Sequence, residues 1–177
     1  MLGSLLASIK ASGKRLDSMQ ELLVEELREI YDAEEQLINA LPQLAQSADD
    51  PRIKEALRQH ANLTMRQRDR LNDVFRRLGE KPAGASSDGM KGIVLEGPVI
   101  SKAEGDPRVK DAAIIAAAQR AEHYEMAAYG SARSFANYLG WKDVAETLQQ
   151  TLDEEGQTDH QLTDLAHSGV NRGASET

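Results

Sequence analysis

The sequence contains no cysteine, which excludes disulfide bonds, thiolate zinc sites, iron–sulfur clusters and cysteine nucleophiles together. Such a composition is compatible with a reducing cytoplasm, where we expect the protein to reside. Aromatic residues make up only 4% of the chain, so its core must be built mainly from Leu, Ile, Val and Ala, as in packed helices. No apolar run approaches the roughly 20 residues that span a membrane, and the N-terminus lacks the positive region of a secretory signal.

The sequence also has no excess of basic over acidic residues. Asp and Glu number 29 against 21 Lys and Arg, which gives a net charge of −8 and a pI near 5.0. A protein of this charge has no surplus of cations to displace counterions from phosphates, so we expect no nucleic-acid partner. The densest basic stretch, residues 66–77, is interrupted by Asp69 and Asp73 at helical spacing. We interpret it as a solvated helix face.

What the sequence does contain is helical periodicity, with no convincing strand alternation. Asp50 and Asp106 each precede a proline, which is typical of a capped helix start. Gly79 and Gly140 are helix stops, and Pro42 should kink or break the helix that contains it. The predicted helices cover about residues 25–50, 51–79, 107–139 and 141–168.

The length of 177 residues fits one domain with a sizeable core. We assign residues 18–169 to this domain, residues 1–17 to a flexible or short-helical extension, and residues 170–177 to a frayed tail. Residues 80–105 are rich in Gly, Pro, Ser and Asp, and leave room for a short helix around residues 90–100. Two tight hairpins with one long connection predict an all-α, ferritin-like four-helix bundle with a crossover between helices 2 and 3.

Each predicted helix carries polar residues at mid-height on its apolar face. Burial of several carboxylates is costly unless they are protonated, paired with cations or bound to metal. These positions include no Lys or Arg, which favours a metal cluster, and oxygen ligands with an imidazole suit iron or manganese. The alternative is that one or two of the residues face solvent and the periodicity is coincidental. The candidate ligands are Glu34, His60, Glu122, Glu125 and Glu155.

Other polar residues near these positions are interpreted differently. The side chain of His123 points about 100° away from the apolar face, because successive residues of a helix are separated by that angle. We therefore expect His123, His160 and His167 on the surface. Tyr31 and Tyr129 lie close to the glutamates along their helices, where they fill the core or hydrogen-bond the ligands.

Three stretches of the chain together resemble the YciF/YciE family of bacterial stress proteins: YDAEEQLINALPQLA (31–45), AAAQRAEHYEMAAYG (116–130) and LDEEGQTDHQLTDLA (152–166). The resemblance covers roughly residues 18–170. It implies a ferritin-like, rubrerythrin-related fold, a homodimer and a dinuclear metal site. The Glu-x-x-Glu pair of such sites matches Glu122 and Glu125, and the glutamates of their first and fourth helices match Glu34 and Glu155.

The second helix departs from the family pattern. The family typically reads His-x-x-Glu-Thr-x-x-Gln there, whereas this chain reads HANLTMRQ (60–67), with Leu63 in place of the bridging glutamate. In the fourth helix Thr158 stands where a histidine is expected three residues after Glu155. A site without the bridging carboxylate holds a single ion, binds weakly or holds none, and the sequence leaves these alternatives open.

These observations favour a ferritin-like stress-response protein with a dinuclear iron or manganese site, intact or degraded. With two metals bound, the chemistry would be oxidation of Fe(II) by peroxide or oxygen. The alternative is a non-catalytic helical stress or assembly protein that has lost metal binding, so the sequence leaves open whether the protein is an enzyme. A storage ferritin is disfavoured, since nothing suggests a cage-forming surface.

We expect a homodimer, and apolar residues of the connection would cover the partner or cap the bundle end: Ile93, Val94, Leu95 and Val99.

Overall fold

The structure is a computed structural model that describes residues 16–176, so the predicted extension falls almost entirely outside the described residues. Short helices lie in the connection and near the C-terminus: α3 (Asp88–Val94), α4 (Glu96–Ser101) and α7 (Asn171–Ser175). Residues 16–176 contain no strand, and none of their helices is long and apolar enough to cross a membrane. The four long helices are α1 (Met19–Ser47), α2 (Pro51–Leu78), α5 (Pro107–Tyr138) and α6 (Lys142–Leu165).

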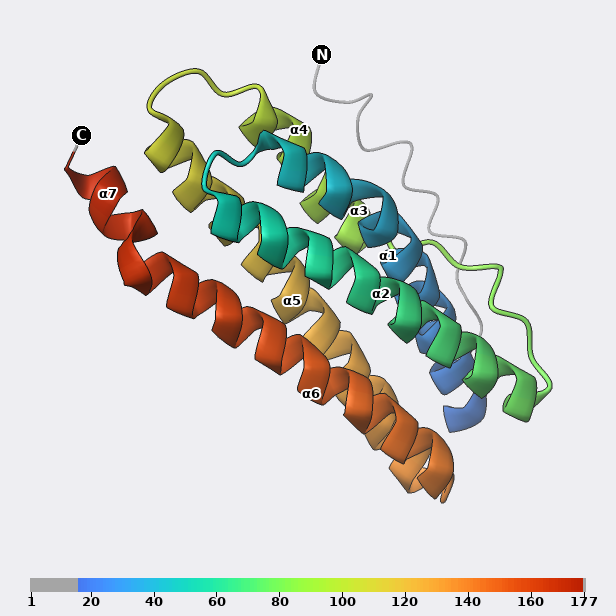
Figure 1. Ribbon diagram of the computed structural model, residues 1–177. Coiled ribbons are helices and arrows are strands. Elements are labelled where there is room, and N and C mark those ends of the chain that lie inside the picture. The colour runs from blue at the N-terminus through green and yellow to red at the C-terminus, as the bar shows by residue number, and fades with distance from the viewer. Residues whose placement is uncertain (1–15, 177) are drawn as a thin grey trace, which may run out of the picture.

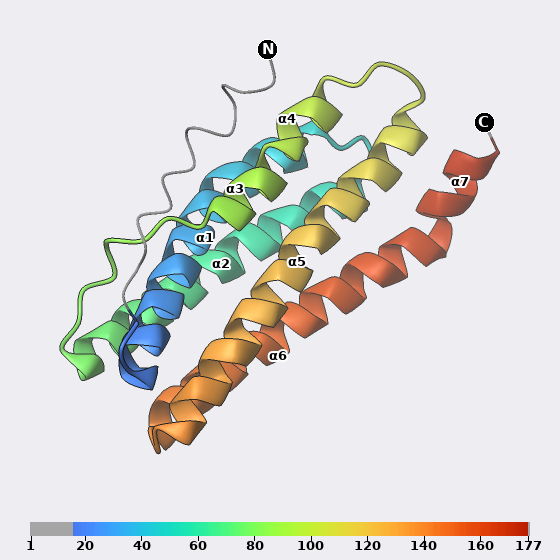
Figure 2. The ribbon, with the colours of Figure 1, turned by 180° about the vertical axis from the view of Figure 1, so that it is seen from behind.

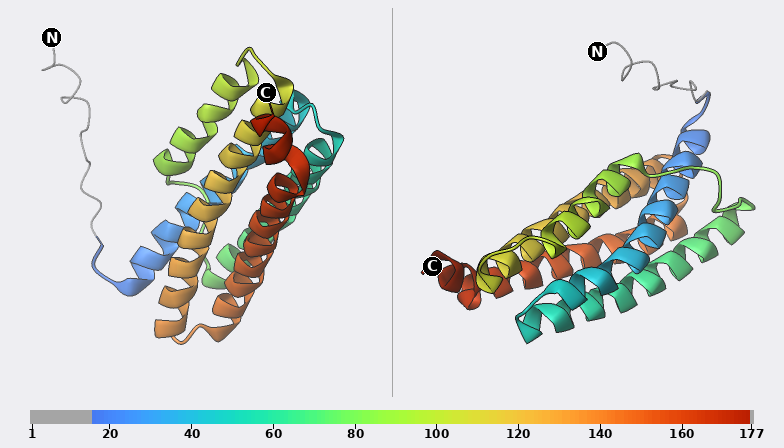
Figure 3. Two further views of the ribbon diagram at one scale, coloured as in Figure 1. Left: turned by 90° about the vertical axis from the view of Figure 1, so that its left-hand side faces the viewer. Right: turned by 90° about the horizontal axis from the view of Figure 1, so that it is seen from above.

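The four long helices lie side by side, and their order explains the long connection (Figures 1 and 2). Helices α1 and α2 form one antiparallel hairpin, and α5 and α6 form another. Helices α2 and α5 run in the same direction, so the chain must return along the length of the molecule between them. It does so through α3 and α4, which contact both α1 and α5 (Figure 3). The predicted crossover is therefore present, with two short helices instead of one.

The helix boundaries follow the local signals in the sequence. Asp50 and Asp106 each accept a hydrogen bond at 2.8 Å from a backbone N–H two residues later, and a proline occupies the first helical position. These contacts satisfy N–H groups that have no partner inside the helix. Gly79 ends α2 with φ of 67°, a left-handed conformation that favours glycine.

Two boundary predictions need correction. The break that Pro42 could have caused is absent: helix α1 continues through this residue, because Leu41 and Leu44 on either side are buried and hold both halves on one core. A kink at Pro42 stays a prediction. The predicted frayed tail is helical: a π-helical turn, Ala166–Val170, breaks at Gly169 and leads into α7. Val170 is only 6% exposed, so the tail packs against the domain rather than leaving it.

The apolar core is divided into two clusters, one at each end of the long helices. One contains Leu23, Leu27 and Val74; the other contains Leu41, Ile53 and Ile114 and also receives Ile93 and Val94 from the connection. Ile93 and Val94 thus cap this end of the core, whereas Leu95 and Val99 are exposed. The middle of the molecule, between the two clusters, is filled with polar side chains.

Candidate metal centre

A layer of buried polar side chains separates the two apolar clusters. Glu34, Glu122 and Glu155 are 0% exposed, Glu125 is 1% exposed and His60 is 3% exposed. None of the five candidate ligands therefore faces solvent, which rules out a coincidental periodicity. The layer consists of Glu34 from α1, His60, Thr64 and Gln67 from α2, Glu122 and Glu125 from α5, and Thr151, Glu155 and Thr158 from α6.

Four of the candidates come close enough to share one ion. His60, Glu122, Glu125 and Glu155 each offer one ligand atom, and these atoms all lie within 4.8 Å of one another. Ligand atoms placed about 2.0–2.4 Å from a common ion are separated by at most ~4.8 Å. The geometry of this four-residue set therefore matches a metal centre. Glu34 is outside the set, and one of its carboxylate oxygens accepts a hydrogen bond from the Tyr129 hydroxyl.

The polar atoms of the four-residue set lack protein partners. Both oxygens of Glu122, Glu125 and Glu155 and both ring nitrogens of His60 are buried without a hydrogen bond to any described residue. His60 Nδ1 lies 3.0 Å from Glu122 Oε1, but the two groups are not oriented to form a hydrogen bond. Buried polar atoms in folded proteins are nearly always paired. A bound cation would supply the missing partner for all four side chains, so the residues fit a metal.

Burial shifts the protonation of these groups. It raises the pKa of Glu122 and of Glu125 well above the usual value, and the negative charge of Glu155 adds to both shifts. It also raises the pKa of Glu155, to about 7. Burial lowers the pKa of His60 to about 4, so the imidazole is neutral at pH 7, the form that binds metals. Without a cation, burial favours the protonated forms of Glu122 and Glu125, and a metal that binds these carboxylates would displace the protons.

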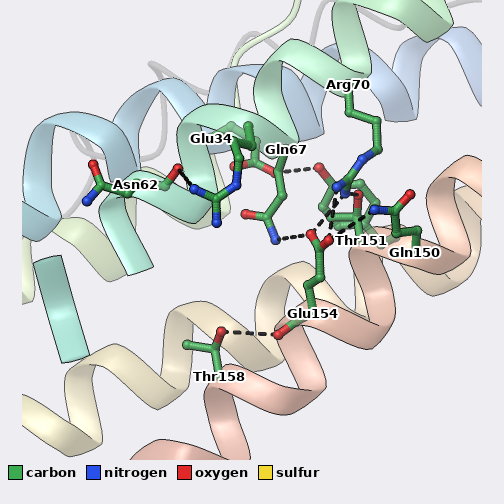
Figure 4. Close-up of polar contacts among 10 residues, drawn as sticks. Glu34, Asn62, Gln67, Arg70, Gln150, Thr151, Glu154 and Thr158 are labelled. Carbon is green, nitrogen blue, oxygen red and sulfur yellow. Dashed lines mark hydrogen bonds and ion pairs between the residues drawn. The ribbon is translucent and has the colours of Figure 1, made fainter. Parts of the chain in front are cut away.

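An ion pair beside the set was not foreseen from the sequence (Figure 4). The Arg70 guanidinium donates to both oxygens of Glu154, at 2.9 Å each, and also to the Thr151 hydroxyl at 2.5 Å. Its positive charge lowers the pKa of Glu34 and Glu155, against the larger opposite effect of burial. The apolar faces themselves include no Lys or Arg, but Arg70 reaches the layer from a position beside them. Arg70 and Glu154 lie just off the apolar face, so the helical periodicity does not select them.

The two tyrosines and the other three histidines considered in the sequence lie outside the four-residue set. Tyr129 hydrogen-bonds Glu34, whereas Tyr31 packs edge-on against Phe75 with ring centroids 6.2 Å apart. His123 and His160 are surface residues as predicted, with side chains 68% and 78% exposed, and His167 is exposed too. No histidine other than His60 therefore belongs to the polar layer.

Comparisons with known proteins agree with the resemblance. Residues 18–175 match a family described as a domain of unknown function, DUF892. Protein YciF of Escherichia coli (strain K12) is 36% identical over 165 residues, which cover 90% of this chain and 96% of that protein. The crystal structure of the E. coli stress protein YciF matches with a TM-score of 0.85 at 34% identity, over 88% of this chain and 99% of that chain. YcfI from Rhodopseudomonas palustris matches with a TM-score of 0.81 at 36% identity, over 85% and 96% of the two chains.

Proposed function

Because the chain belongs to the DUF892 family of YciF-like stress proteins, we propose that it is a ferritin-like four-helix protein that binds iron or manganese in its polar layer. The observation that carries this proposal is the four-residue set. Its six carboxylate oxygens and two ring nitrogens are buried without a hydrogen-bond partner among the described residues, and a cation between the four side chains would supply one.

The charges of the set indicate how many ions it holds. Glu122, Glu125 and Glu155 carry three negative charges when ionised, and His60 is neutral, so one divalent ion leaves a single negative charge. Leu63 supplies no bridging carboxylate for a second ion. Glu34 retains one buried oxygen without a partner. We propose one ion in the four-residue set and a weaker second position beside Glu34.

The protein's own residues determine what such a centre can do. Carboxylates and an imidazole suit iron and manganese, and bound iron would supply electron transfer to peroxide or oxygen. The apolar clusters on both sides keep bulk water away from the layer. The Tyr129 hydroxyl fixes the orientation of the Glu34 carboxylate and stabilises its ionised form.

Metal content and thermal melting test this proposal. Purified protein should contain iron or manganese in colorimetric assays, and Mn(II) should raise the melting temperature, because an ion that binds only the folded state stabilises it. Glu155→Gln should abolish most of the shift. Glu146→Gln, the same change at an exposed position of α6, is the matched control and should keep it. An equal shift in wild type and Glu155→Gln, or no shift in wild type, would refute the proposal.

A second function, non-catalytic assembly, is favoured by one observation. Leu95 and Val99 are 61% and 71% exposed and lie at the junction of α3 and α4 and within α4. Exposed large apolar side chains that are grouped together mark interaction sites more often than isolated ones. We propose that they contact a second copy of the chain in a homodimer.

A further inference from the structure

Gln67 and Thr64 are the buried polar residues of α2 that the four-residue set does not include. The Gln67 side chain is 1% exposed and lies seven residues after His60, which places both on the same face of the helix. Its Nε2 donates a hydrogen bond to Glu154 Oε2 at 3.3 Å. Its Oε1 is buried and accepts no hydrogen bond from any residue between 16 and 176. The amide nitrogen of Gln67 thus has a hydrogen-bond partner, whereas its carbonyl oxygen has none among these residues.

The groups around Glu154 determine whether the NH₂ group or the carbonyl oxygen of the Gln67 side chain faces this carboxylate. Two donors of Arg70 and the Gln150 amide, at 3.2 Å, converge on the Glu154 carboxylate. Arg70 thus pairs with both oxygens of this carboxylate, a contact that the ionised form makes. An ionised carboxylate only accepts hydrogen bonds, so it selects the NH₂ end of Gln67 (Figure 4). The carbonyl end is turned away from Glu154.

Gln67 lies in the same buried layer as the four-residue set. Thr64, which stands between His60 and Gln67 on the same face of α2, is 0% exposed, so the three side chains form one continuous buried row. Glu155 directly follows Glu154 on α6, so the amide lies between the ion pair on one side and the set on the other. A carbonyl oxygen held in such a place resembles the neutral oxygen donors that complete the coordination of hard cations.

We infer that the side-chain carbonyl of Gln67 is a neutral oxygen ligand of the metal centre, and that Arg70 and Glu154 fix its orientation. This inference rests on the proposed function. It gives the centre a fifth protein ligand without adding a negative charge. In a chain where Leu63 provides no carboxylate, Gln67 supplies an oxygen from the same helix. The ion pair acts only as a positioning element, since neither Arg70 nor Glu154 belongs to the four-residue set.

The experiment compares Mn(II) affinity and metal-free stability in four proteins, by titration calorimetry and by the loss of the free Mn(II) paramagnetic resonance signal. Gln67→Leu should weaken Mn(II) binding by about tenfold or more, the scale expected for groups that ligate or orient a metal. Glu154→Gln should also weaken it, because a neutral amide at residue 154 can donate to Gln67 and let the carboxamide rotate. Gln150→Ala removes another hydrogen bond to Glu154 but no polar-layer residue, and should bind like the wild type.

The melting temperature of the metal-free proteins separates ligation from packing. If Gln67 is a ligand, Gln67→Leu should melt no lower than the wild type without metal, because an unpaired buried carbonyl has been removed. Weaker Mn(II) binding together with an unchanged or higher metal-free melting temperature supports the inference. Equal Mn(II) affinity of wild type and Gln67→Leu overturns it and leaves the proposed function intact. Absence of Mn(II) binding by the wild type overturns both.

Discussion

At the scale of single residues, helical spacing located the candidate ligands but not the groups around them. Glu34, Glu122 and Glu155 were predicted inside the molecule because each shares a helix face with buried Leu or Ala residues. The spacing of residues along the sequence indicates which face of a helix a residue occupies, but it does not indicate which residues of other helices its side chain contacts. The approach of Arg70 depends on a long side chain that crosses between helices, so the sequence pattern did not identify it. For Tyr129 the pattern left open whether the side chain fills the core or hydrogen-bonds a glutamate, and the structure shows that it hydrogen-bonds Glu34.

Leu63→Glu tests whether the set is a metal centre that has lost a carboxylate. Leu63 is half-buried, one turn after His60. Without metal the new carboxylate should lower the free energy of unfolding by about 1–3 kcal/mol, since an unpaired polar group enters the interior. Mn(II) should then raise the melting temperature more than it does in the wild type. Leu63→Gln carries no charge and is the control; equal metal responses of the two variants would contradict the prediction.

The stability of the metal-free protein should depend on pH through Glu155. Its pKa is about 7 when folded, against an ordinary value of 4.5, so its contribution is fully present below about pH 4.5 and lost as pH rises to about 7. The loss is on the order of 3 kcal/mol, at about 1.4 kcal/mol per pKa unit. The lowered pKa of His60 acts in the opposite direction, since it costs stability as pH falls below about 6.5.

Urea unfolding of wild type and Glu155→Gln between pH 5 and pH 8 isolates the carboxyl from His60. The glutamine variant should gain stability relative to the wild type as pH rises, because it has no proton to lose. A constant difference between the two proteins across this range would show that Glu155 titrates normally.

At the scale of helices, capping signals predicted the starts of α2 and α5, and the glycine stop at Gly79 predicted the end of α2. Asp50, Asp106 and Gly79 act through their own side chains or backbone, so the sequence suffices to locate them. The continuity of α1 through Pro42 and the helical tail after Gly169 do not follow from the local signals, because tertiary packing overrides them. The burial that sustains both segments comes from residues far away in the chain.

A buried carboxylate connects the α1–α2 turn to α5, and its removal should be costly. Asp111 is 4% exposed and accepts hydrogen bonds from the backbone N–H groups of Asp49 and Asp50, at 2.8 and 2.7 Å. Asp111→Ala leaves both donors without this acceptor and should lower the free energy of unfolding by about 1–3 kcal/mol. Chemical denaturation measures the effect. Glu104→Ala, in an exposed loop, should change it by less than about 0.5 kcal/mol.

At the scale of the whole molecule, the two hairpins and the long crossover were predicted from the sequence, because a connection of this length is needed only between helices that run in the same direction. The family resemblance was confirmed by the match of residues 18–175 and by the YciF structure. Helical periodicity identifies the helix faces that pack within one chain. It does not indicate how a second copy of the chain would bind in a homodimer.

The proposed homodimer can be tested at its exposed apolar residues. Leu95→Ser with Val99→Ser should shift sedimentation from dimer toward monomer, since the apolar area available for contact falls. Tyr138→Ser changes an even more exposed side chain, 84% exposed, at the far end of α5 and is the control. A wild-type protein that sediments as a monomer at micromolar concentration would contradict the prediction.

The division of the polar layer between the two hairpins has a consequence for the speed of folding. His60 belongs to the first hairpin, whereas Glu122, Glu125 and Glu155 belong to the second, so the layer forms only when the hairpins dock. Each hairpin is built from contacts close in sequence, which form quickly, while docking must close the long connection. We expect docking to limit the refolding rate. Inserting enough Gly and Ser between α2 and α3 to double the length of the whole connection between the hairpins should slow refolding roughly threefold in stopped-flow fluorescence, while the early gain of helical circular dichroism keeps its rate.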